Sequence, residues 1–200
     1  MTRQESLELL KENITNQNLI KHCLAVEAIM MVLARHFGEG EEDKSSSSPF
    51  AIAREDEGKW GLAGLLHDID YEKTKDNPKK HSLIGTKMLE DLRVDKEICQ
   101  AVKVHNEAHG IKPESLMEKA LFVVDPLTGL IVAAALVLPS KKLADLTVEN
   151  VLNRFKEKAF ARGVNREIIR KSEEFLNLRL EEFIKIGLEA MQGISNQLGL

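Results

Sequence analysis

Four of the six histidines lie where the helical pattern calls for apolar side chains, and this placement is the strongest chemical signal in the chain. A buried imidazole needs a hydrogen-bond partner or a metal ion. An acid, Asp125, also closes the apolar run ALFVVD. Imidazoles combined with carboxylates suit Zn, Fe, Mn, Co or Ni, and without thiolate pairs they favour an open catalytic site over a closed structural one. The four histidines are His22, His67, His81 and His105.

A single buried histidine is more often a hydrogen-bonded core residue than a metal ligand. Five inward groups of metal-binding type on separate segments are harder to explain in that way, so their convergence is the central prediction. Spacing alone does not fix which of them share an ion.

The elements that carry these residues are predicted to be helices throughout, so the fold class is all-α. Apolar residues recur at intervals of three and four, and no segment alternates as a strand does. Pro126 removes a backbone donor inside one of these helices, which predicts a kink or a break beside Asp125. The expected helices cover 2–14, 19–37, 56–68, 78–92, 95–107, 115–138, 147–161, 165–175 and 177–198.

The order of these segments suggests three parts: an N-terminal helix at 1–16, a core at 17–138, and a helical extension at 139–200 that packs on the core. Between two helices, the stretch EGEEDKSSSSP at 39–49 contains acids and four serines but no large apolar residue. We expect a surface loop there, with a lid over a site as the alternative.

Composition excludes several functions. The chain has 200 residues with 28 Lys and Arg against 32 Asp and Glu, a net charge of −4, so long nucleic acid is a poor partner. Aromatic residues make up 4%, too few for stacking platforms. The N-terminus lacks a signal-peptide pattern and the longest apolar stretch is short, so we expect a cytoplasmic protein without a membrane partner. Cys23 and Cys99 are expected to be reduced core thiols.

The ordered set of His22, the doublet in LLHDID at 67–68 and Asp125 in FVVDPLTGLI resembles the HD superfamily of metal-dependent phosphohydrolases. HSLIG at 81–85 and VHNE at 104–107 are similar to the HDIG subset. The resemblance implies an all-α HD helical bundle with additional C-terminal helices. It implies one divalent ion (Mn, Fe, Ni, Co, Zn or Mg) bound by His22, His67, Asp68 and Asp125, and a second bound by His81 and His105 with Asp68 as a bridge.

One position departs from the two-metal pattern. Members with two ions often have a further histidine where this chain has Asn106, so the second ion is expected to bind more weakly. His109 is an alternative ligand one turn beyond His105, although a surface role fits it equally well.

The implied reaction is the hydrolysis of a small phosphorylated metabolite, either a nucleotide or another phosphate ester, by metal-activated water. Asp68, with Asp70 or Glu72, is the catalytic candidate, and Glu107 is an alternative proton donor or acceptor. Asp70 and Glu72 can equally be partners that orient imidazoles. The cations Lys141 and Lys142 are candidates for binding substrate phosphate.

A competing hypothesis is a non-catalytic metal- or ligand-binding signalling module whose C-terminal helices dock a partner. The amphipathic face of the last helix also makes a homodimer an option.

Overall fold

The computed structural model describes residues 1–39 and 56–200 and confirms the all-α class, because the described residues contain helices and no strand. The predicted loop at 39–49 lies, apart from Glu39, outside the described residues. The helices are α1 (Arg3–Asn13), α2 (Gln17–Glu39), α3 (Asp56–Leu66), α4 (Tyr71–Thr74), α5 (Leu83–Asp91), α6 (Lys96–Val104), η1 (Glu107–His109), α7 (Leu116–Leu136), η2 (Leu143–Asp145), α8 (Val148–Lys156), α9 (Arg166–Arg170), α10 (Ser172–Leu176), α11 (Leu180–Gly193) and α12 (Ser195–Leu198).

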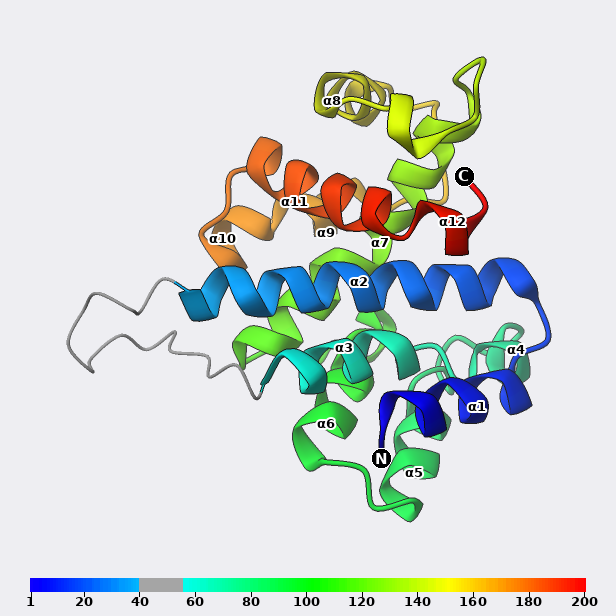
Figure 1. The fold of residues 1–200 in the computed structure, drawn as a ribbon. Helices are drawn as coiled ribbons and strands as arrows, with labels where there is room; N and C mark the ends of the chain where they lie inside the picture. Colours follow the sequence, from blue (N-terminus) through cyan, green and yellow to red (C-terminus); the bar gives the residue numbers. More distant parts are fainter. Residues whose placement is uncertain (40–55) are drawn as a thin grey trace.

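Two long helices, α2 and α7, form the centre of the bundle. In Figure 1, α2 crosses the molecule with α11 along one side and α1 and α3 along the other. The contact between α2 and α3 is close because Gly64 has no side chain: a Cβ there would lie 2.9 Å from the backbone of Glu27. This close approach brings the end of α3, with the His67-Asp68 doublet, beside the first turns of α2.

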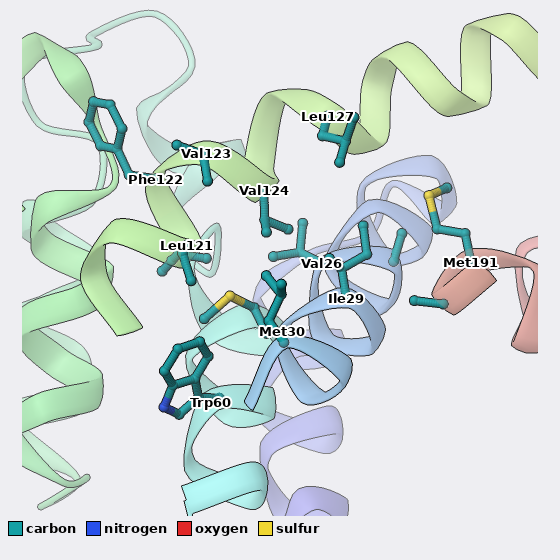
Figure 2. Close-up of a cluster of buried hydrophobic side chains, with 14 of the residues drawn as sticks. Val26, Ile29, Met30, Trp60, Leu121, Phe122, Val123, Val124, Leu127 and Met191 are labelled. Carbon is teal, nitrogen blue, oxygen red and sulfur yellow. The ribbon is translucent and has the colours of Figure 1, made fainter. Parts of the chain in front are cut away.

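Apolar side chains from α2, α3, α7 and α11 meet in one core (Figure 2). Val26 and Met30 of α2 are fully buried against this core, and Trp60 of α3 is 3% exposed. Burial of such side chains contributes about 1.5–3 kcal/mol each, so the core fixes the relative positions of the helices that carry the site. Cys23 and Cys99 are buried and form no disulfide, as expected for core thiols.

By length and composition alone, α2 and α7 are each apolar enough to cross a membrane. In the folded chain, 50% and 61% of their most apolar windows are buried against other helices. Central helices of a globular bundle have the same character, so these two features give only weak support for a membrane segment.

Several predicted boundaries need correction. The segment predicted as one helix at 78–92 begins only at Leu83, because 78–82 form turns. Pro126 lies inside α7, which continues through it, so a break is the wrong expectation. The helix predicted at 147–161 ends at Lys156, and those at 165–175 and 177–198 are each divided in two.

The C-terminal helices cover one side of this centre. Helix α11 packs on α2 and α8, and α9 and α10 pack on α7. Helix α11 also contacts α7 closely at Gly187, where a Cβ would lie 2.7 Å from the Leu127 side chain.

Candidate metal centre

Six side chains from five separate segments converge at one place. His22 comes from α2, the His67-Asp68 doublet follows α3, His81 precedes α5, His105 ends α6, and Asp125 lies in α7. The Nε2 atoms of His22 and His67 are 3.1 Å apart, and those of His81 and His105 are 3.2 Å apart. Two nitrogens that bind one ion at about 2.1 Å each have a separation of about 3 Å, so both pairs suit a shared ion.

Asp68 lies between the two histidine pairs. Its Oδ2 is 3.6 Å from the Nε2 atoms of both His22 and His67. Its Oδ1 is 3.2 Å from Nε2 of His81 and 3.6 Å from that of His105. One carboxylate therefore presents an oxygen to each half of the cluster, which is the arrangement that a bridging ligand needs.

Asp125 lies closer to the first half, although one of its oxygens is also within 4.8 Å of a ring nitrogen of His105. Oδ1 of Asp125 is 3.1 Å from Nε2 of His22 and 3.8 Å from Nε2 of His67. The first half thus has two imidazoles and two carboxylates, whereas the second half has two imidazoles and one shared carboxylate. Because it offers more ligands, the first half is expected to bind a metal ion more firmly than the second half.

The outer ring nitrogens determine the tautomer of each histidine. Nδ1 of His67 is 2.8 Å from the Gly64 carbonyl, and Nδ1 of His105 is 2.6 Å from the Val102 carbonyl. A carbonyl oxygen only accepts, so both Nδ1 atoms donate, and a neutral ring then has its lone pair on Nε2, inside the cluster.

His22 and His81 are oriented by side chains. Nδ1 of His22 lies 2.9 Å from Thr128 Oγ1, and that hydroxyl donates to the Asp125 carbonyl at 2.9 Å, which leaves its oxygen free to accept. Nδ1 of His81 lies 2.9 Å from Asp70 Oδ1. When the rings are neutral, all four Nε2 atoms therefore present a lone pair to the inside of the cluster, a donor set that fits a divalent cation.

The cluster favours positive charge at its centre. Burial opposes charge on the His81 ring, but the carboxylates of Asp68 and Asp70 outweigh burial and raise its pKa to about 9. Burial also opposes charge on the carboxylates of Asp68 and Asp125, yet the surrounding imidazoles hold the pKa of both well below the usual range. A divalent ion supplies such positive charge without requiring protons on the rings.

Asp70 supports His81 from a fully buried position. Its Oδ1 accepts from His81 Nδ1 and from the Ser82 amide, and its Oδ2 accepts from the Gly85 amide at 2.7 Å. Ser82 has a φ of 67°, a sparsely populated conformation for a residue with a side chain. Gly85 permits this close contact, since a Cβ there would lie 3.2 Å from Asp70 Cγ. These contacts involve His81, Ser82 and Gly85 of the HSLIG motif and favour an orienting role for Asp70 over direct proton transfer.

The other predicted candidates lie outside the cluster. The Glu72 carboxylate accepts from the backbone amides of Thr15 and Asn16, so it ties α4 to the α1–α2 connection. Lys141 and Lys142 follow the end of α7, whose last residue is about 16 Å along the helix axis from Asp125. Neither lysine lines the cavity at the cluster.

Asn106 and His109 contact the residues beside His81. Asn106 donates to the carbonyls of Pro78 and His81, and its Oδ1 caps the next turn. Nε2 of His109 lies 2.7 Å from the His81 carbonyl. His109 is therefore engaged with backbone rather than facing the cluster.

A cavity of about 450 Å³ opens onto the cluster and exposes His22, Asp68, His81, His105 and Asp125. Glu107, Phe122 and residues 163–165 are among the other residues that line it.

Arg166 follows the 163–165 loop and stabilises the backbone around it. The guanidinium donates to the backbone carbonyls of Phe155, Glu157 and Phe160, among others. Next to it, the Asn165 side chain donates to both Glu107 carboxylate oxygens at 3.1 Å, which connects the loop to η1 across the cavity rim.

The sequence reasoning missed Thr128, Ser82, Asn165 and Arg166. Thr128 is three residues after Asp125, a spacing that places two helical side chains on one face, and this was the available signal. Asn165 and Arg166 come from the distant C-terminal segment, and no local pattern connects them to the cluster.

A family model described as "HD domain" matches residues 19–135, more than half of the chain. The chain belongs to the HD domain family. The predicted resemblance to HD proteins is thereby confirmed, and the matched residues of this HD domain include all six cluster residues. No solved structure gave a significant match.

Among curated proteins, this HD domain chain is similar to ribonuclease Y of Lawsonia intracellularis, 27% identical over 155 residues that cover 76% of the chain and 26% of that protein. Ribonuclease Y of Oleidesulfovibrio alaskensis is 27% identical over 158 residues, covering 76% and 27%. An uncharacterized protein of Methanocaldococcus jannaschii is 29% identical over 121 residues, covering 60% and 63%. The chain thus spans about a quarter of the two ribonucleases and less than two thirds of the third relative.

Proposed function

We propose that this HD protein is a divalent-metal-dependent phosphohydrolase that acts on a small phosphorylated metabolite. The observation that carries the proposal is the inward convergence of four Nε2 atoms around Asp68, at the base of an open cavity. His22, His67, Asp68 and Asp125 would hold one ion, and His81, His105 and Asp68 a second. An ion held there acts as a Lewis acid on a phosphoryl group and makes water a competent nucleophile near neutral pH.

The protein residues position the reacting groups. Asp68 presents one oxygen to each half and is buried, so its carboxylate stays fixed during the reaction. Thr128 and Asp70 hold the rings of His22 and His81 in the required tautomer. Such orienting partners usually account for 10- to 100-fold in metal affinity or activity.

Glu107 is the proposed proton acceptor in the cavity. Apart from Asp68 and Asp125, it is the one carboxylate among the described residues that line the cavity. Its two hydrogen bonds from Asn165 hold this exposed carboxylate at the cavity. Asp70 does not line the cavity, because its carboxylate is fully buried and contacts His81, Ser82 and Gly85.

The substrate class is a nucleotide or another phosphate ester, and the cavity volume of about 450 Å³ suits a small molecule. Two relatives are named ribonuclease Y, so phosphodiesters belong in the test beside phosphomonoesters. We propose a cytoplasmic setting, with no membrane or long nucleic acid as partner.

The experiment is a turnover screen of the protein loaded in turn with Mn, Fe, Co, Ni or Mg. The substrates are p-nitrophenyl phosphate, bis(p-nitrophenyl) phosphate and a nucleotide panel. Asp68→Asn should abolish turnover with the fold retained, whereas Asp76→Asn, the same change at an exposed site, should have no effect. Bound metal without turnover on any substrate would instead favour the signalling-module hypothesis.

A further inference from the structure

A second cavity of about 560 Å³ adjoins the metal centre, and its lining differs in charge. Glu107 and Phe122 line both cavities, so the two are neighbours along one surface. The second cavity, here called the lysine groove, contains Lys112, Lys119 and Lys171. The mechanism proposed above uses none of these lysines.

The groove and the metal centre are connected along one face of α7. Lys119, Phe122, Pro126 and Gly129 are three or four residues apart, so they share that face. Lys119 lines the groove, Phe122 lines both cavities, and Pro126 and Gly129 line the metal cavity. From Lys119 to Asp125 the helix rises about 9 Å. Phe122, which is 6% exposed, therefore lies on this face between Lys119 and the proposed metal ligand Asp125.

The lysines of the groove are available for an anion. Within the described residues, no carboxylate lies within 4 Å of any of the three ammonium groups, whereas Lys59, Lys87 and Lys185 all have such partners. Lys171 Nζ instead lies 5.6 Å and 5.5 Å from the ring centroids of Phe122 and Phe175. Two acids also line the groove: Glu107, at the junction with the metal cavity, and Glu174, which is exposed. The lysines outnumber them.

We propose that the lysine groove binds a second phosphate of the substrate, and that the nucleoside between the two phosphates passes over the small exposed part of Phe122, which is 6% exposed. This inference rests on the proposed phosphohydrolase function and narrows its substrate class to nucleotides with phosphates on two positions, such as nucleoside bisphosphates or short dinucleotides. The ammonium groups that line the groove supply positive charge for a phosphate, and the half-buried ring of Phe175, which also lines it, offers an apolar contact to a base. A simple monophosphate leaves the groove empty.

The test measures binding rather than turnover. Isothermal titration calorimetry of the Mn-loaded protein compares phosphorothioate forms of adenosine 3′,5′-bisphosphate and adenosine 5′-monophosphate, which resist hydrolysis. The wild-type protein should bind the bisphosphate at least 10-fold more tightly. Lys119→Gln and Lys171→Gln should each lower bisphosphate affinity by about 3- to 10-fold, since each removes one partly exposed charge from the contact.

The double variant should lose the preference for the bisphosphate altogether. Lys185→Gln on α11, an exposed lysine outside both cavities, is the matched control and should retain the preference. Equal affinities for the two nucleotides in the wild-type protein, no binding of either, or a preference that survives the double substitution would overturn the lysine groove as a phosphate site. None of those outcomes would contradict the proposed hydrolase function. That function is tested separately, by metal-dependent turnover of other phosphate esters.

Discussion

The substitution Asp70→Asn separates an orienting role from a catalytic one. In the wild-type protein three donors share the carboxylate: the His81 ring, the Ser82 amide and the Gly85 amide. An asparagine has one oxygen and one NH₂ group, so at least one of these donors faces another donor. A buried unsatisfied donor costs about 1–3 kcal/mol, which is the expected loss in free energy of unfolding.

The same substitution should act on only one half of the cluster. His81 loses its partner, so the affinity of the half that contains His81 and His105 should fall by about 10- to 100-fold. The half that contains His22 and His67 has no contact with Asp70 and should keep its affinity. The His81 pKa, about 9 in the metal-free wild-type protein, should fall because a nearby negative charge is gone.

Metal titration followed by calorimetry, with NMR titration of the His81 ring, measures both effects. Asp76→Asn, exposed and outside the cluster, is the matched control and should leave both unchanged. An unchanged His81 pKa and unchanged metal affinity in Asp70→Asn, combined with lost turnover at full metal occupancy, would refute the orienting role. That result would support Asp70 as the group that transfers a proton.

Three further predictions concern stability and affinity. In the metal-free protein the raised pKa of His81 contributes stability that is fully present below about pH 6.5 and is lost as the pH rises through about 9. Denaturant titrations across this range should show that the free energy of unfolding falls by up to about 3 kcal/mol. A free energy of unfolding that does not change would contradict the raised His81 pKa. Thr128→Val removes the acceptor of the His22 Nδ1 hydrogen, so metal affinity should fall about 10-fold and return in Thr128→Ser; equal affinities in all three proteins would exclude this contact as a determinant. Gly85→Ala should cost about 1–3 kcal/mol on chemical denaturation because its Cβ would lie 3.0 Å from Ile69, whereas Gly58→Ala, with nothing within 4 Å, should be neutral or stabilising.

The sequence predicted the fold class and the cluster because both depend on strong local signals. Periodicity of three and four residues identifies helices, and the position of His22, His67 and His105 on apolar faces identifies them as inward-facing. The boundaries were less accurate. The turns at 78–82 that aim His81 depend on hydrogen bonds to Asp70, which lies on another element and is invisible to a local pattern.

Sequence proximity to the doublet or to Asp125 was a weaker guide to a residue's role than the helical pattern. Asp70 and Glu72 both follow the doublet closely, yet one contacts His81 and the other ties down the α1–α2 connection. Lys141 and Lys142 follow the helix of Asp125, but the length of that helix carries them away. The lysine groove combines η1, the 110–113 segment, α7, and Lys171 with α10, so only the tertiary packing brings its cations together.

The most direct test of the central claim is an anomalous-scattering measurement on crystals of the Mn-loaded protein. The account predicts a peak within about 2.0–2.3 Å of the inward Nε2 atoms and of an Asp68 oxygen, first in the half with His22 and His67 and then, at higher Mn concentration, in the half with His81 and His105. A manganese ion bound elsewhere in the chain, or none at saturating concentration, would contradict it.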